Sequence, residues 1–427
     1  MKKLVLVSTS LFSTALFAAM PVNQPTGSSF TLSNAPNQRA LSTAFANPAA
    51  PFIVVNQEVD DSFRFGILGP LSIGVEMGDV SDLGDQVEEV EDLLDATYTD
   101  FNEANSALNR ANEILDGIGD TAYIKTTASM QIPFMPVIYK TKNSGAFMID
   151  ASLSGVAKGS LLAGDVKVNS TNDGLTTKSS FYAQTATDLQ IGFGYSQSMW
   201  EHEKGMLIGG VKANLHDISM GRASVSLSDD DVDAGDAISD SISDDAVSST
   251  GVGLDLGVLW VSNNYQAGLT IANINEPEFD GAIIDQTCGT QSCNDASSLV
   301  SAGKLDASDK YVMEMQSTVD FAISTKGKQF TIGMSYDTNA VQDAVGDEYQ
   351  WATTSLSYYG DSHFLPGIRV GMRQNMAGTE LSYATFGLTI LKRLNIDLAV
   401  ALDTVEDEEG DELPRSGYFS IGYDTAF

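Results

Sequence analysis

The chain has 427 residues, of which 23 are basic and 57 acidic, so its formal net charge is −34. A surface this acidic repels nucleic acid and excludes direct nucleic-acid binding as the main activity. The length is too great for one ordinary globular core but normal for a single large barrel. Glycine is abundant (38) and proline scarce (11), a composition that suits strands that bend and pack small residues.

The first 19 residues have the features of a signal peptide. Two lysines precede an apolar stretch over residues 4–17, and Ala18 and Ala19 offer a cleavage position. The alternative, an N-terminal membrane anchor, is disfavoured because this stretch is short for a span, and no later run approaches the roughly 18 apolar residues that a membrane helix needs. We therefore expect residues 1–19 to direct export. A chain without a spanning helix can cross a bilayer only as a closed barrel.

The rest of the chain alternates between apolar and small or polar residues. From Val252 to Trp260, one face carries only large apolar residues, while the other carries Asp255 and two glycines. Such alternation gives a strand one oily and one polar face. We predict about 14 strands, an even number as in single-chain bacterial barrels. The predicted strands cover residues 63–77, 123–139, 145–157, 178–197, 205–222, 250–261, 264–274, 311–323, 328–336, 349–359, 367–374, 381–391, 394–403 and 416–427.

The connections between these strands alternate between short and long. Residues 392–393, 324–327 and 262–263 are short connections, whereas 275–310 and 223–249 are long. Outer-membrane barrels have short periplasmic turns and longer external loops. A soluble sandwich has no reason to separate the two kinds, so the alternation predicts an all-β transmembrane barrel in the bacterial outer membrane.

The first long connection, residues 78–122, is predicted to be helical. Val87, Val90, Leu94 and Phe101 begin a near-heptad of apolar residues in an acidic segment, which indicates an amphipathic helix or helical hairpin. Packing of this apolar stripe on its own chain is the favoured interpretation. Docking of a partner is the alternative.

The C-terminal strand ends in a pattern typical of outer-membrane barrels. Gly422 and Tyr423 lead to the final aromatic residue, Phe427, and alternate residues before them are mostly apolar or aromatic. This pattern resembles the signal by which the barrel-assembly machinery recognises a closing strand. It implies two partners, that machinery and the lipid of the outer membrane.

The segment between the signal peptide and the barrel lacks strand alternation. Residues 27–50 are rich in small and polar residues and end in Asn47-Pro48-Ala49, just before an apolar stretch. Unpaired backbone cannot face lipid. A loose periplasmic tail is one alternative. We expect instead that residues 20–51 form a hatch inside a barrel made by residues 52–427, with lumen-facing Asp255, Arg369 and Arg373 as its polar partners.

Two external loops carry candidate structural features. Cys288 and Cys293 are the only cysteines, and in an oxidising compartment they are predicted to form a disulfide. Asp229, Asp231 and Asp233 have the spacing of calcium ligands, but an alanine replaces the glycine that turns such a loop. A solvated acidic loop is therefore preferred, and no metal or other cofactor is expected.

The sequence offers little support for catalysis. Its three histidines, His202, His216 and His363, do not form a metal-binding spacing, and no nucleophile elbow or phosphate loop occurs. We expect no enzyme activity, although distant strands can in principle assemble a hydrolase site.

The N-terminal segment and two early strands carry a family resemblance. The segment ending in Asn47-Pro48-Ala49, and the stretches 130–137 and 145–147, are similar to long-chain fatty-acid transporters, which are 14-strand barrels with an N-terminal hatch. Within that superfamily, the length and the acidic helical insertion resemble the TraF-type proteins named for conjugal transfer. The ligand-pocket residues of the transporters cannot be matched here residue by residue, so the resemblance implies no fatty-acid substrate.

Two main functions follow as hypotheses. The resemblance favours an assembly or surface component of conjugal plasmid transfer, with conjugation or secretion proteins as partners. The alternative is a hatch-gated channel or transporter for small hydrophobic compounds. Loss of partner binding with an intact barrel supports the first, and altered flux on changing the hatch supports the second.

Overall fold

The computed structural model describes most of the chain. Predictions on the signal peptide, on Asp229, Asp231 and Asp233, on Cys288 and on Phe427 lie outside the described residues. The described ranges are 27–55, 62–78, 83–119, 121–142, 145–169, 174–228, 246–284, 289–308, 310–406 and 411–424.

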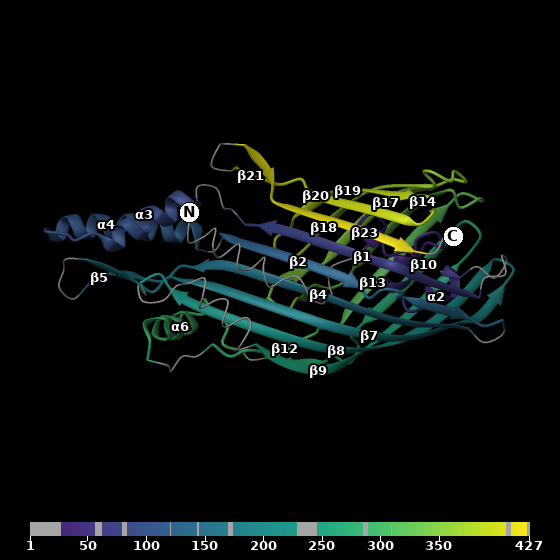
Figure 1. Cartoon of the computed structure of the whole chain (residues 1–427), viewed down its shortest axis with the longest axis horizontal. Helices are drawn as coiled ribbons and strands as arrows, with labels where there is room; N and C mark the ends of the chain where they lie inside the picture. Colours follow the sequence, from purple (N-terminus) through teal and green to yellow (C-terminus); the bar gives the residue numbers. More distant parts are fainter. Residues whose placement is uncertain are drawn as a thin grey trace.

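Fourteen antiparallel strands form a closed barrel, as the alternation predicted (Figure 1). Each strand pairs with its neighbours along the chain, and β1 closes the ring by pairing with β23, with Ile73 opposite Phe419. The barrel strands are β1 (Phe63–Met77), β2 (Tyr123–Gln131), β4 (Ala146–Leu162), β7 (Ser180–His202), β8 (Gly205–Ser226), β9 (Val247–Val261), β10 (Tyr265–Ala272), β13 (Gln316–Ser324), β14 (Phe330–Asp337), β17 (Trp351–Tyr359), β18 (Gly367–Asn375), β19 (Ser382–Ile390), β20 (Leu394–Ala401) and β23 (Ser416–Asp424).

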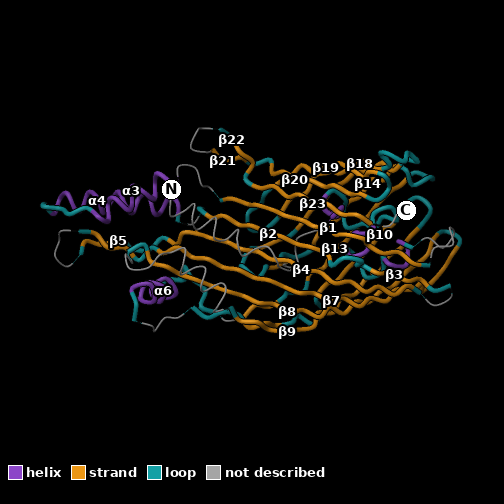
Figure 2. Tube along the Cα trace, viewed as in Figure 1, coloured by secondary structure: helices purple, strands orange, loops and turns teal. Residues whose placement is uncertain are grey.

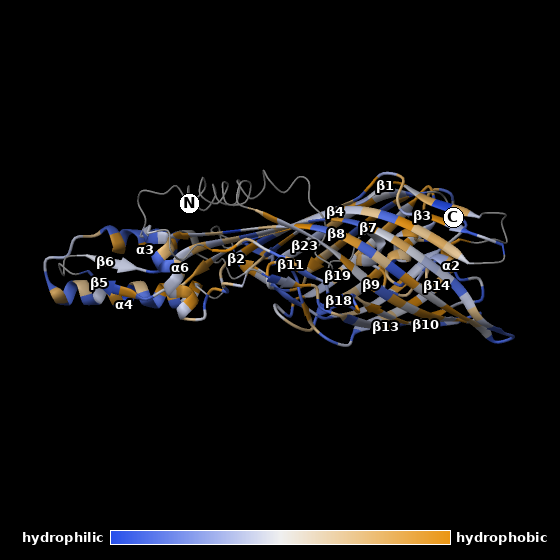
Figure 3. Ribbon diagram, turned by 90° about the horizontal axis from the view of Figure 1, so that it is seen from below, coloured by the Kyte–Doolittle hydropathy of each residue, from blue (hydrophilic) through white to orange (hydrophobic). Residues whose placement is uncertain are grey.

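The outer face of the barrel is apolar. On β9, Val252, Leu254, Leu256 and Val258 are exposed, and hydrophobic and hydrophilic residues alternate along strands such as β9 and β14 (Figure 3). This is the arrangement of a wall between lipid and a polar lumen. None of the described helices is long and apolar enough to cross a membrane.

Aromatic residues gather at the end of the barrel that carries the short turns. Trp200 and Trp260 flank two of these turns with ring centroids 5.8 Å apart, and Phe330 and Tyr358 flank two others at 4.7 Å. Aromatic girdles mark the membrane interfaces of such barrels. This rim therefore fits the periplasmic interface.

The predicted strand 123–139 is interrupted. β2 ends at Gln131 and β3 (Val137–Lys140) continues the pairing with β1 and β4 after a break. Pro133 and Pro136 lie in this break and have no N–H to donate to a strand ladder. The wall is therefore irregular at this point.

The first external loop forms a helical hairpin beyond the barrel (Figure 2). It consists of α3 (Leu83–Asp95) and α4 (Phe101–Ile118), which pack on each other and on β5 (Val166–Val168) and β6 (Leu175–Thr177). Phe101 is exposed, so its place in the predicted apolar stripe is wrong. The reason is that Asp100 caps α4 and starts a new helix there. The buried stripe of α4 is formed by Ala104, Ala107, Ala111, Ile114, Leu115 and Ile118.

The other external loops form small hairpins and one helix. α6 carries Cys293, which is buried and disulfide-bonded; its pairing with Cys288 stays a prediction. The hairpins and the helix of these loops are β11 (Glu278–Asp280), α6 (Gln291–Ser301), β12 (Lys310–Val312), β15 (Val341–Gln342), β16 (Glu348–Tyr349), β21 (Thr404–Glu406) and β22 (Glu412–Pro414).

Residues 27–55, called the hatch below, pack against the inner face of the barrel. The hatch contains η1 (Gly27–Phe30), η2 (Leu41–Phe45) and α2 (Pro51–Val54). The boundary predicted at residue 51 lies too early, because α2 belongs to the hatch and β1 begins at Phe63. Proline suits the first position of a helix, and α2 buries Ile53 against the wall residues Ile208 and Leu259.

Candidate functional site in the barrel lumen

The Asn47-Pro48-Ala49 motif lies against β9 and β10. The buried Asn47 side chain donates from Nδ2 to the carbonyl oxygens of Val258 (3.4 Å) and Leu269 (3.3 Å). Its Oδ1 accepts from the N–H of Ala49 at 2.8 Å. One side chain therefore fixes a turn of the hatch and attaches it to the wall, which is how asparagine commonly stabilises turns.

Two wall glycines make room for this motif. A Cβ at Gly257 would lie 2.2 Å from Oδ1 of Asn47, and a Cβ at Gly210 would lie 2.1 Å from the carbonyl oxygen of Pro48. Neither position tolerates a side chain unless the hatch moves. Glycine in these strands is thus explained by the close approach of another backbone.

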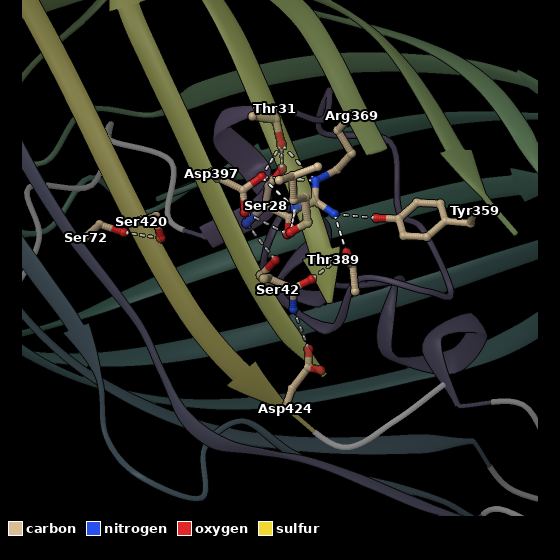
Figure 4. Close-up of polar contacts among 12 residues, drawn as sticks. Ser28, Thr31, Ser42, Ser72, Tyr359, Arg369, Thr389, Asp397, Ser420 and Asp424 are labelled. Carbon is tan, nitrogen blue, oxygen red and sulfur yellow. Dashed lines mark hydrogen bonds and ion pairs between the residues drawn. The ribbon is translucent and has the colours of Figure 1, made fainter. Parts of the chain in front are cut away.

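A buried ion pair holds the other end of the hatch (Figure 4). Arg369 on β18 lies 2.9 Å from Asp397 on β20, and both side chains are essentially inaccessible to solvent. Thr31 of the hatch donates to Asp397 and accepts from Nε of Arg369 at 3.0 Å, while Ser28 donates to Asp397 at 3.2 Å. The hatch hydroxyls complete the polar shell of this pair.

The same arginine is satisfied on its remaining sides by the wall. Its Nη1 donates to Tyr359 (3.1 Å) and Thr389 (2.6 Å), and its Nη2 donates to the carbonyl oxygen of Leu388 (3.0 Å). A buried charge with this many partners positions its neighbours firmly. Arg369 was predicted to face the lumen and Asp397 was not, although a lone carboxylate on the inward face of an alternating strand is a usable signal.

The other two predicted lumen residues play different roles. The guanidinium of Arg373 stacks 4.0 Å from the Trp351 ring and 5.9 Å from that of Phe30 in the hatch. Asp255 accepts from the Asn214 side chain (2.6 Å) and from the N–H of Asn273 (2.9 Å), which are wall groups. Arg369 and Arg373 therefore contact the hatch, whereas Asp255 braces the wall.

A cavity of about 240 Å³ is lined by both the hatch and the wall, and we call it the chamber. Phe45 and Asn34 of the hatch line it, together with Lys212, Asp255 and Arg373 of the wall. Its lining is rich in charged and amide side chains, which is unusual because most small-molecule pockets are largely apolar.

A loop from the external side crosses the lumen. Residues 338–350, called the cross-lumen loop below, connect β14 to β17, and its Asp343 lies 2.6 Å from Lys125 on β2. Six strands lie between β2 and β14 in either direction round the ring, so the loop reaches the opposite wall. Asp347 extends the network, at 2.7 Å from Lys125 and 2.5 Å from Lys158.

The pKa values of the two carboxylates of this loop are shifted in opposite directions. Burial raises the pKa of Asp347, but the nearby ammonium groups of Lys125 and Lys158 outweigh it and hold that pKa below its ordinary value. For Asp343 burial dominates, and its pKa is raised despite Lys125. Val345 adds an apolar contact by packing in a cluster that joins Phe279 and Tyr311 of another external loop to barrel-strand residues such as Met220.

The predicted histidines do not assemble a catalytic group with one another. Nδ1 of His216 lies 2.8 Å from Asp188, and both are buried on the lumen side. His202 ends β7 and His363 lies in the connection between β17 and β18. Among the described residues no cluster of metal-ligating side chains occurs.

A closed 14-strand barrel with an apolar outer face and an occupied polar lumen defines an outer-membrane β-barrel protein. A family model described as F plasmid transfer operon, TraF, protein matches residues 44–337. The match covers more than half of the chain, which therefore belongs to this family, as the resemblance predicted. No curated protein sequence matches the chain.

Solved structures of outer-membrane channels share this fold. A TodX deltaS2S3 mutant monoaromatic hydrocarbon channel is 11% identical with a TM-score of 0.50, covering 95% of this chain and 100% of that one. A Pseudomonas aeruginosa FadL homologue is 11% identical (TM-score 0.44, 96% and 100% covered), and the Pseudomonas putida toluene transporter TodX is 12% identical (0.43, 95% and 98%). At these identities the likeness concerns the fold alone.

Proposed function

We propose that the chain is an outer-membrane channel with two barriers in series, the hatch and the cross-lumen loop. The observation that carries this proposal is the attachment of the hatch to inward-facing wall groups by hydrogen bonds around Asn47 and around the Arg369–Asp397 pair. Such contacts stabilise the closed state by about 1 kcal/mol each and can be broken and re-formed.

The proposal is tested by conductance in planar bilayers. Four proteins are compared: the full chain, a deletion of residues 27–50, Lys125→Met, and the two changes combined. We expect the largest conductance from the combined variant, because each single change leaves the other barrier in place. A deletion of residues 83–118, which lie beyond the barrel, is the matched control and leaves conductance unchanged.

Two results would overturn this function. A combined variant that is folded but as closed as the full chain shows that neither segment blocks a pore. Protease cleavage within residues 27–50 of the folded protein shows that the hatch is a tail. Heat-dependent migration on gels establishes folding of each variant.

A role in conjugal plasmid transfer is the second candidate, and membership of the TraF family favours it. The helical hairpin of α3 and α4 is the segment best placed to meet a partner, because it extends past the barrel (Figure 1). Plasmid transfer that is lost on deleting residues 83–118, with folding and conductance intact, supports this role. Unchanged transfer in that variant argues against it.

The solute of the proposed channel can be hydrophobic or polar. The TodX deltaS2S3 mutant is named for monoaromatic hydrocarbons, but at 11% identity its likeness concerns the fold and does not identify the solute of this chain. The charged lining of the chamber favours a polar one.

A further inference from the structure

Several buried polar groups of the chamber have no protein partner. Nε of Arg373, Nε2 of His216, Nε2 of Gln131 and Oγ of Ser129 make no hydrogen bond within the described part of the chain. All four residues line the chamber, and each is at least nine-tenths buried. Buried polar groups are normally paired, so four in one cavity point to a polar occupant.

The unpaired groups differ in charge across the lumen. Arg373 on β18 forms no ion pair with any described carboxylate, although Asp337 lines the same cavity and attracts it, and the ring of Trp351 holds it in place. His216 lies on β8, nearly opposite, with five strands between them on one side of the ring and seven on the other. When Nδ1 of His216 donates to Asp188, its Nε2 is a hydrogen-bond acceptor that faces the chamber.

The chamber thus offers an unpaired cation at one wall and, at the other, an acceptor backed by a carboxylate, where the cation Lys212 already has a carboxylate partner. Asp150 lies on the same side as His216, paired with Lys212 at 3.1 Å. Guanidinium groups bind carboxylates through two parallel hydrogen bonds, and an acceptor backed by a carboxylate suits an ammonium group. A hydrocarbon in this chamber would leave all these groups unpaired, which is costly.

We propose that the chamber binds a small zwitterion of amino-acid size, with its carboxylate on Arg373 and its ammonium group on the side of His216. The inference rests on the proposed channel function, because it names the class of solute that the channel takes. The size follows from the cavity of about 240 Å³, which is small for a ligand site.

Trp351 provides a direct readout, because its ring stacks on Arg373. The chain has three tryptophans. The full-length protein is prepared with Trp200→Phe and Trp260→Phe, so that Trp351 is the only one that remains. Its fluorescence is titrated in detergent micelles with L-alanine, with propanoate and alaninamide as the carboxylate-only and ammonium-only counterparts, and with toluene.

We expect saturable quenching by L-alanine, with weaker binding of propanoate and alaninamide and none of toluene. Arg373→Gln should lower the affinity for L-alanine by at least about tenfold, since a charge-assisted contact is lost. Arg373→Lys should restore only part of the affinity, because lysine lacks the fork of donors. The matched control Arg110→Gln, on the external hairpin, should bind L-alanine as before.

The inference is overturned by any of three results. These are no saturable response to L-alanine, equal affinity in the folded Arg373→Gln protein, or tighter binding of toluene than of L-alanine. Conductance in the combined hatch and Lys125 variant without L-alanine binding keeps the channel and removes the zwitterion site. Saturable L-alanine binding without conductance keeps the site and removes the channel.

Discussion

Single glycines of the wall decide how closely the hatch can approach. The Pro48 carbonyl occupies the place that a side chain at Gly210 would need, so Gly210→Ala must displace the hatch or strain the wall. Overpacking of this kind typically costs about 1–3 kcal/mol. We expect the variant to remain folded with a hatch that proteases cut, whereas the hatch of the parent protein resists cleavage.

The control for this prediction is Gly417→Ala on β23. A Cβ there meets only one atom, a carbonyl oxygen at 3.9 Å. Proteolysis of the hatch should be unchanged in that variant. Equal cleavage rates in the two proteins would show that close approach at Gly210 does not hold the hatch.

The Arg369–Asp397 pair is a residue-scale feature with a large expected energetic consequence, because both charges are buried. Asp397→Asn leaves the Arg369 charge buried with weaker partners, and breaking such a pair typically costs about 3–5 kcal/mol. We expect a lower unfolding midpoint in denaturant. The double variant Arg369→Met, Asp397→Leu removes both charges and should regain much of the loss. A single variant as stable as the parent would contradict the proposed anchoring.

Among the elements, the barrel strands were predictable and the segments inside the barrel were not. Strand alternation depends on local sequence, so the position of β9 and the exposure of Leu254 follow from period two alone. The acidic residues Asp343 and Asp347 look like part of a solvated loop. Only the folded chain brings them to Lys125, more than two hundred residues away.

The site was likewise only partly predictable. Asn47 and Arg369 were identified because an Asn-Pro turn and a lumen-facing arginine are visible locally. Ser28 and Thr31 were missed, since a hydroxyl in a segment rich in small residues carries no signal until Asp397 is beside it. Tertiary contacts between distant segments therefore account for most of what sequence analysis left out.

The cross-lumen loop should respond to pH with a defined sign. The pKa of Asp347 is lowered in the closed loop, so its stabilisation is complete above the ordinary value of about 4 and is lost as the pH falls through the lowered pKa. The raised pKa of Asp343 has the opposite effect on stability, because protonation removes the cost of burying its negative charge. In the protein lacking residues 27–50, conductance should stay low at neutral pH and rise only below about pH 4.

Matched lysine variants separate this effect from general acid damage. Lys125→Met in the same hatch-deleted protein should conduct already at neutral pH, because the loop loses its main partner. Lys310→Met removes a solvent-exposed pair with Glu278 and Asp280 and should behave like the parent, as surface pairs contribute little. A conductance that rises at the same pH in all three proteins would contradict the assignment.

On the scale of the whole molecule, the distribution of loops predicts the orientation in the outer membrane. The aromatic rim with the short turns is assigned to the periplasm, and the α3–α4 hairpin lies at the far end of the barrel (Figure 1). An epitope inserted at residues 97–99, between the two helices, should therefore be reached by antibody on intact cells. The same epitope at residues 203–204, in the turn between β7 and β8, should be reached only after the outer membrane is opened.

Both proteins should fractionate with the outer membrane and shift on unheated gels. Surface labelling at residues 203–204 but not at 97–99 would reverse the orientation, and recovery as a soluble periplasmic monomer would exclude the membrane barrel itself.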